Sequence, residues 1–273
     1  MILQSLYNLS DDQIEFQVRD RLSFMRFLGL SLSDIVPDAK TIWLFREQLT
    51  EAKLAKKLFN QFDDFLRENG FSAKKGQIVD ASIIAAPKQR NTREENKEIK
   101  DGNIPQDWPE NKKRQKDTDA RWIRKGGQNH YGYKNHIDID VKHKLIRDYE
   151  VTAASVHDSN VFEQLLDKDN SSKDVYADSA YGSVDKRNAL KKKRFRGYIQ
   201  RKGCCYKQLT ECQIKSNYRR AKIRSRVEHI FGVQTMRAGS LLIRTIGIIR
   251  AKTKIGLRNL AYNIDRYCLL SLA

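Results

Sequence analysis

Three acidic residues stand in settings where a carboxylate is unusual. Asp80 lies within the β-branched run 77–84, Asp178 ends the apolar run that begins at 175, and Glu228 lies in a predicted helix among basic side chains. A carboxylate inside a buried strand costs free energy unless it is paired or bound to a metal. Two carboxylates from neighbouring parallel strands and one from a helix on the sheet could hold two divalent cations, and Mg²⁺ prefers such oxygen ligands. Taken singly, each acid has an ordinary alternative as a capping, salt-bridged or solvated residue.

The elements that must position these acids alternate between strands and helices. Short β-branched or alternating runs predict strands at 77–84, 132–141, 145–152, 174–178 and 197–199. Helices are expected to start near His157 and Asp158 and to span 184–193 and 217–236, the last with apolar residues at i, i+4, i+7 and i+8 from Ile223. This order is that of an α/β domain, which we place at residues 73–273.

The first 72 residues have a different, helical pattern. Ser10 and Gln13 form a capping box ahead of an apolar stripe that runs to Met25, and Asp38 can cap a second helix. A third helix is expected from about Leu54 to a terminating glycine at position 70. We therefore expect an all-helical module over residues 1–72. It could be a DNA-binding helix-turn-helix or a plain three-helix unit, and its lack of basic character weakens the first alternative.

Residues 88–127 interrupt the α/β pattern with a highly charged stretch. Its only large apolar residues are Ile99, Ile104, Trp108, Trp122 and Ile123. Such a segment is too long for an ordinary loop. It is either a disordered insertion or a flap that orders on a ligand, and the two tryptophans favour the flap.

The positive charge of the chain is concentrated in its last third. The whole chain carries 52 Lys and Arg against 34 Asp and Glu, whereas residues 186–273 alone carry 23 basic and 3 acidic residues. A polyanion is the expected partner of such a region, and nucleic acid is the leading one. The alternative is a solvated basic face.

Several classes of protein and site are excluded or disfavoured. No apolar run reaches the ~18 residues that span a bilayer, and the longest, 239–249, contains Arg244. No secretory signal is apparent, so a cytoplasmic location is expected. The four cysteines lack zinc-finger spacing and are expected to be reduced thiols; they are Cys204, Cys205, Cys212 and Cys268.

Longer segments resemble a known family over nearly the whole chain. They include "IVDASIIAAPKQRN", "HYGYKNHIDIDVKHKLIRDYEVTAASVHDS", "DVYADSAYGS" and "RAKIRSRVEHIFG". These segments are similar to bacterial insertion-sequence transposases of the IS5 type, with an Asp-Asp-Glu site on a ribonuclease H-like fold. The resemblance implies Asp80, Asp178 and Glu228 as the first, second and third acids. It further implies Mg²⁺ or Mn²⁺, double-stranded DNA bearing terminal inverted repeats, target DNA, a homo-oligomer on DNA and association with the nucleoid.

The resemblance also bears on residues that would grip DNA. Related transposases place a Tyr seven positions before the Glu, an Arg four before it and a Lys seven after it. Arg224 fits, but the outer positions hold Ala221 and Thr235, so Lys222 or Gln234 would have to substitute. The expected DNA contacts are Lys134, His136, Tyr181, Lys222, Arg224 and Arg226. Lys134 and His136 are expected to point toward the acids or to face solvent, and Tyr181 to touch a phosphate or to shape its turn.

The expected activity is metal-dependent cleavage at insertion-sequence ends followed by strand transfer of the 3′-hydroxyl into target DNA. A catalytically silent DNA-binding remnant or inhibitor, and a metal-dependent nuclease of the same fold, are the alternatives. Helical periodicity already runs at Ile2 and Leu3 with no capping residue before it. We therefore expect an N-terminally shortened reading frame whose helical module leaves apolar faces uncovered.

Overall fold

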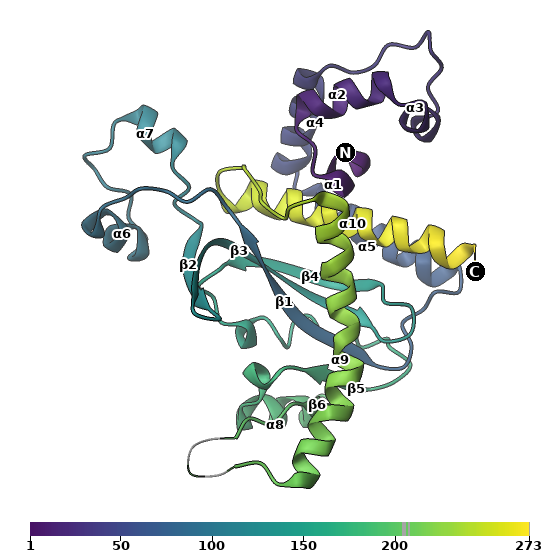
Figure 1. Cartoon of the computed structure of the whole chain (residues 1–273), viewed down its shortest axis with the longest axis vertical. Coiled ribbons are helices and arrows are strands. Elements are labelled where there is room, and N and C mark those ends of the chain that lie inside the picture. The colour runs from purple at the N-terminus through teal and green to yellow at the C-terminus, as the bar shows by residue number, and fades with distance from the viewer. Residues whose placement is uncertain (204–205, 207, 273) are drawn as a thin grey trace.

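A mixed sheet carries the first two acids and is flanked by helices (Figure 1). The computed structural model describes residues 1–203, 206 and 208–272, and within them the sheet has six strands. The strands are β1 (Gln77–Ala85), β2 (Arg121–Lys125), β3 (Gln128–Asp140), β4 (Ile146–Ala153), β5 (Asp174–Ala177) and β6 (Arg196–Ile199). Strand β3 is antiparallel to β1, β2 and β4, whereas β5 runs parallel to β1 and β6 parallel to β5. The order β4-β3-β1-β5-β6 is that of a ribonuclease H-like sheet, so the predicted fold class is confirmed.

Strand β1 is buried on both faces, which explains its β-branched sequence. Ile78 and Ile84 pack into the cluster that contains Ile137 and Val227, whereas Val79 packs into a second cluster on the opposite face. Asp80 lies directly opposite Ile137 of β3 in the register. Because opposed residues of an antiparallel pair share a face, Asp80 points to the face that carries the first cluster.

Helices cover the two faces of the sheet. On the face of Asp80 lie α5 (Leu54–Glu68), α9 (Glu211–Ala238) and α10 (Ile248–Ser271), whose side chains Phe59, Val227 and Ile255 share a cluster with β1 and β3. The other face is covered by residues 161–166, by the 3₁₀ helix η2 (Ser179–Tyr181) and by α8 (Val184–Lys192). Helix α9 crosses beside β1 and β5, as Figure 1 shows, and so brings the third acid to the sheet.

The prediction of a helix that starts near residue 157 is wrong. Only a short 3₁₀ helix, η1 (Asp158–Asn160), forms there. His157 accepts a hydrogen bond from the Ser159 amide through Nδ1, at 3.3 Å, so the residue that caps this turn is His157 and not Asp158, the cap expected from the sequence. Asp158 instead pairs with Lys134 of β3 at 2.8 Å. This ion pair holds the segment against the sheet.

The N-terminal module begins with four helices: α1 (Ile2–Tyr7), α2 (Asp11–Asp20), α3 (Leu22–Leu28) and α4 (Ala39–Glu51). The predicted capping box of Ser10 and Gln13 is confirmed, and Asp38 caps α4 by accepting from the Thr41 amide at 2.7 Å. The stripe expected to continue to Met25 is interrupted at Arg21, whose extended backbone separates α2 from α3. The core of the module is small, with Ile14, Val18 and Phe24 at its centre.

Helix α10 joins the module to the sheet. It contacts α1, α4 and α5 as well as β4. Arg258 of α10 donates to the side chain of Asn8 at 2.9 Å, and Asn259 exchanges hydrogen bonds with Asn135 of β3 at 2.9 and 3.1 Å. Helix α5, which precedes the predicted boundary at residue 72, packs on the sheet through Phe59 against Tyr149. The helical character of residues 248–271 was not predicted from the sequence.

The insertion 88–127 is ordered by its own contacts. It contains α6 (Arg93–Lys100), α7 (Glu110–Gln115) and strand β2. Glu95 accepts from Trp108 Nε1 and from Lys112 Nζ, both at 2.6 Å, and Trp108 is buried. The segment is therefore ordered by contacts within itself, and a flap that orders on a ligand stays a prediction.

None of the helices in the described part of the chain combines the length and the apolar character needed to cross a membrane. Cys212 and Cys268 are exposed free thiols. Cys204 and Cys205 lie outside the described residues.

Candidate active site

The sheet topology places the first two acids side by side. Strands β1 and β5 are parallel, with Val79 opposite Ala177; Asp80 follows Val79 within β1, and Asp178 comes directly after the last residue of β5. Asp178 caps η2 by accepting from the Ala180 amide at 2.8 Å. The expectation of two carboxylates from neighbouring parallel strands is confirmed.

Arg224 of α9 connects the first and third acids. Its Nη1 lies 2.5 Å from Asp80 Oδ2 and 3.4 Å from Glu228 Oε1. Arg224 and Glu228 are separated by one helical turn, so both side chains reach the same point above the sheet. The other oxygen of Asp80 accepts from the Ala81 amide at 2.8 Å. A basic side chain therefore lies between two of the acids.

The carboxyl group of Asp80 is in an unfavourable environment for negative charge. Burial is the largest cause of its raised pKa, and the charges of Glu228 and Asp178 raise the pKa further, whereas the Ala81 amide and Arg224 lower it. Mutual repulsion of this kind requires that the three carboxylates lie near one another. A cation is the natural way to relieve it.

Tyr181 is buried beside the acids and does not face solvent. Its ring packs on Phe162 with centroids 4.9 Å apart, and its hydroxyl has no hydrogen-bond partner among the described residues. Burial raises the pKa of the hydroxyl, with Asp80 as the next cause. Of the two roles expected for Tyr181, the structure favours shaping the turn after Asp178 over phosphate contact.

The expectation that Lys134 and His136 point toward the acids, or face solvent, is wrong. The register places His136 opposite Ala81, one residue beyond Asp80, so both basic side chains lie on the other face of the sheet. Both are buried. Lys134 donates to the Val156 carbonyl at 2.6 Å in addition to its ion pair with Asp158, and His136 Nε2 lies 2.9 Å from Thr152 Oγ1. Through these contacts the two side chains connect β3 to β4 and to the segment 156–158, on the face of the sheet opposite Asp80.

The expected DNA contacts on α9 differ in availability. Lys222 is exposed, whereas Arg226 donates to the Val141 carbonyl at 2.5 Å. Two further exposed basic residues, Lys215 and Arg219, were not singled out from the sequence. Together with Lys222 they are spaced i, i+4 and i+7, which puts all three side chains on one helix face. This spacing could have been recognised in the sequence. We call Lys215, Arg219 and Lys222 the basic face of α9.

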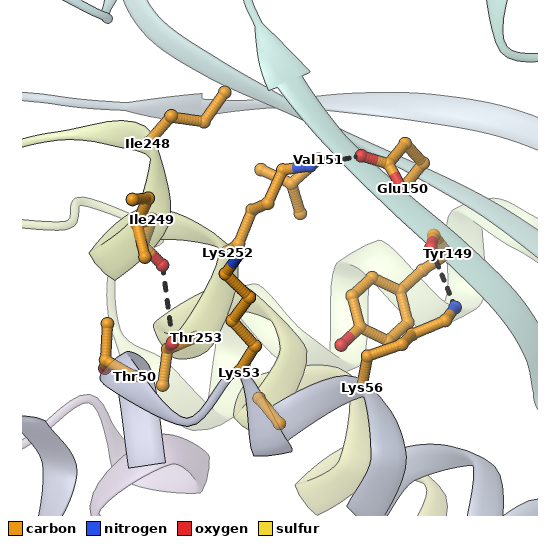
Figure 2. Close-up of a pocket in the computed structure, with 11 residues that line it drawn as sticks. Thr50, Lys53, Lys56, Tyr149, Glu150, Val151, Ile248, Ile249, Lys252 and Thr253 are labelled. Atoms are coloured by element: carbon orange, nitrogen blue, oxygen red, sulfur yellow. Dashed lines mark hydrogen bonds and ion pairs between the residues drawn. The ribbon is translucent and has the colours of Figure 1, made fainter. Parts of the chain in front are cut away.

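A separate cavity of about 440 Å³ lies between the α4–α5 turn, β4 and the start of α10 (Figure 2). Two of its lysines are already paired, Lys252 with Glu150 at 2.7 Å and Lys56 with the Tyr149 carbonyl at 2.9 Å, as the dashed lines in Figure 2 show. None of the acids Asp80, Asp178 and Glu228 lines this cavity. This cavity is therefore separate from the candidate active site.

Comparisons with known proteins identify the family of the chain. Residues 72–264 match the family described as "Transposase DDE domain", and residues 1–48 match the family described as "Transposase domain (DUF772)". A solved structure, described as the cryo-EM structure of a piggyBac transposase synaptic complex with hairpin DNA, superposes with a TM-score of 0.47 and 11% sequence identity. That superposition covers 96% of this chain and 62% of the other chain. Since the DDE domain accounts for well over half of its residues, the chain belongs to the DDE-domain transposase family.

Proposed function

We propose that this chain is an IS5-type transposase that cleaves DNA at the ends of its insertion sequence and joins the free 3′-hydroxyl to target DNA. The observation that carries the proposal is that Asp80 of β1, Asp178 just after β5 and Glu228 of the basic helix α9 lie near one another. The family supplies the class of protein. The order of cleavage and joining, and the IS5 type, are our inference.

The acids fit a divalent cation by the chemistry of their donor set. All three offer carboxylate oxygens, the ligands that Mg²⁺ and Mn²⁺ prefer. Burial, and to a smaller extent the charges of Glu228 and Asp178, raise the pKa of Asp80, and a divalent charge would favour its ionised form. Among the described residues, no three His, Cys, Asp or Glu side chains form a ready metal-binding group. The guanidinium of Arg224 lies between Asp80 and Glu228.

Asp80, Asp178 and Glu228 would hold the cations through their carboxylate oxygens. Two bound cations would lower the pKa of an attacking water or 3′-hydroxyl and stabilise the leaving 3′-oxygen in an in-line displacement at phosphorus. The side chain of Glu228 is 57% exposed and so is free to move toward Asp80 once Arg224 withdraws. The basic face of α9 would contact DNA phosphates, which position the duplex without reading its sequence.

The test is to remove one carboxylate charge at a time. Asp80→Asn, Asp178→Asn and Glu228→Gln should each abolish Mg²⁺-dependent cleavage of the DNA that flanks the gene while retaining DNA binding. A variant that cleaves within tenfold of the parent, about 1.4 kcal/mol in barrier, would exclude its residue from the site. A pre-cleaved end then separates the alternatives, because a nuclease of the same fold would cut without joining and a silent remnant would bind without cutting.

We further propose that the protein acts as a homo-oligomer whose copies meet through the N-terminal module. Residues 8–45 carry four basic and six acidic residues, so their charge gives no support for contact with DNA. They expose large apolar side chains instead, among them Leu32 and Ile35, which are 81% and 93% exposed. Exposed apolar surface of this kind marks interaction sites.

A further inference from the structure

A group of positively charged side chains lies near the turn that follows Asp178. A hollow of about 210 Å³ between α8, β6 and α9 is lined by four basic residues from three segments. These residues, which we call the cationic pocket, are Arg187, Lys191, Arg201 and Arg220. The remaining lining is Leu190, Gly197 and Ile199, so no acidic residue is among the described residues that line the hollow. The three elements meet at the end of the molecule opposite the N-terminal module in Figure 1.

The cationic pocket is held in place by specific contacts. Arg220 Nη1 donates to the Ile199 carbonyl at 2.6 Å. The side chain of Asn217 accepts from the Arg201 amide at 2.9 Å and donates to the Arg201 carbonyl at 2.8 Å, so the backbone of Arg201 is fixed to α9. Arg187 lies close to Gly182, in the turn that follows Asp178: a Cβ atom added to Gly182 would be 3.7 Å from Arg187 Nη2. The pocket therefore adjoins the turn of the second acid.

The charges in the pocket lack the partners that neighbouring basic residues have. Lys186 and Lys193 of the same region both pair with Glu163 at 3.0 Å. Within the described residues, Arg187, Lys191, Arg201 and Arg220 form no ion pair with an acid. Burial and the charges of Arg201 and Arg187 lower the pKa of Arg220. Converging guanidinium groups repel one another, and a tetrahedral oxyanion both neutralises them and matches their donor geometry.

The position of the pocket relative to the acids suggests which anion it takes. Arg220, Arg224 and Glu228 follow at intervals of four residues on α9 and so share one helix face. Eight residues of helix span about 12 Å, which corresponds to roughly three or four nucleotides at 3.4 Å per step. We propose that the cationic pocket binds a backbone phosphate of the DNA strand a few nucleotides from the bond held at the acids. This proposal rests on the function proposed above.

The experiment measures DNA binding without a divalent cation, so that it does not depend on cleavage. The pocket variant Arg187→Gln with Arg201→Gln leaves the structural bond of Arg220 in place. The matched control, Arg194→Gln with Arg244→Gln, removes the same charge at exposed arginines outside the pocket. The probe is a duplex of the DNA that flanks the gene, with one phosphate at a time replaced by a neutral methylphosphonate.

The parent and the control should lose affinity severalfold when one particular phosphate is neutralised, and the pocket variant should show no further loss at that position. An identical profile across all positions in the parent and the pocket variant would overturn the proposal. The proposal would also be overturned if inorganic phosphate, at matched ionic strength, inhibited the binding of every duplex to the same extent. That result would indicate that the pocket binds a free anion and not a phosphate of the DNA strand. If the parent shows the pocket-dependent phosphate but does not cut with Mg²⁺ or Mn²⁺, the catalytic function fails and the phosphate site stands.

Discussion

Arg224 occupies the place between Asp80 and Glu228 where a cation is expected, so it should compete with divalent metal. When a competing state must be displaced, the apparent affinity falls by the fraction of protein that is free to bind. Arg224→Gln should therefore bind Mn²⁺ more tightly than the parent. The gain in affinity is about tenfold if, in the parent, the state with Arg224 paired to the acids is about tenfold more populated than the unpaired state. Calorimetry without DNA measures this directly.

The control for this prediction is Arg226→Gln. It removes an equal charge two residues away, at a side chain that contacts a backbone carbonyl and not the acids. Equal Mn²⁺ affinities for Arg224→Gln and Arg226→Gln would show that only the general positive field opposes the metal.

His136 should make folding stability depend on pH. Burial lowers its pKa from 6.5 to about 4, more than the opposing charge of Asp158 raises it. Above pH 6.5 the histidine is neutral in both the folded and the unfolded protein, so its full contribution to folding stability is present there. As the pH falls from 6.5 toward 4, only the unfolded chain takes up a proton, and this contribution is lost. The loss should approach roughly 3 kcal/mol.

Denaturant unfolding at several pH values tests this expectation. His136→Gln keeps a polar side chain able to bond Thr152 but cannot titrate. The parent should lose stability relative to this variant between pH 6.5 and 4. A constant difference between the two proteins across that range would mean that His136 does not titrate as its burial requires.

At the scale of the elements, the basic face of α9 should control the salt dependence of DNA binding. Each phosphate contact contributes about 0.9 to the slope of log affinity against log salt. Replacing Lys215, Arg219 and Lys222 with alanine should reduce the slope by between two and three if all three contact phosphate. Fluorescence anisotropy over a range of salt concentrations measures the slope.

A matched triple variant separates local contact from total charge. Lys40, Lys53 and Lys57 are equally exposed but lie on or beside α4 and α5. Their replacement should leave the slope nearly unchanged. A similar decrease in both variants would assign DNA binding to net charge alone.

The strands around the acids could be predicted from the sequence because local pattern and tertiary burial agree there. The β-branched run of β1 and the apolar spacing of α9 both match what the structure buries. The helix expected near His157 is limited to a 3₁₀ turn, in which Asp158 pairs with Lys134, a residue distant in sequence that no local pattern brings into view. The orientation of Lys134 and His136 depended on the register between β1 and β3, which no local pattern determines. Arg224 between the acids follows from i, i+4 spacing with Glu228, but its contact with Asp80 needed the fold.

At the scale of the whole molecule, the N-terminal module should be the site of self-association. Large apolar side chains of α2 to α4 and the intervening turn are exposed by roughly half or more: Phe16, Leu22, Phe27, Leu28, Leu32, Ile35, Trp43, Leu44 and Phe45. With aromatic side chains contributing about 150–250 Å² each when fully exposed, this surface is on the order of the ~800 Å² per partner that a stable interface buries.

Sedimentation velocity over a concentration series tests the oligomer. Leu32→Asp with Ile35→Asp should shift the protein toward monomer, whereas Leu269→Asp with Leu272→Asp, at exposed positions near the end of α10, should not. A parent protein that is monomeric at every concentration, with or without DNA, would contradict the proposed interface.

The position of α10 also decides the order in which the molecule can assemble during translation. Helices α1 and α4 leave the ribosome well before α10, the helix on which they pack. At about 5–20 residues per second the interval is roughly 10–50 s, during which their apolar faces remain available to chaperones or to other nascent chains. Glu228 and Arg224 of α9 are also synthesised after both strands that carry the other acids. A nascent chain therefore has Asp80 and Asp178 before it has the helix that carries Glu228, so the three proposed site residues can meet only after α9 has packed on the sheet.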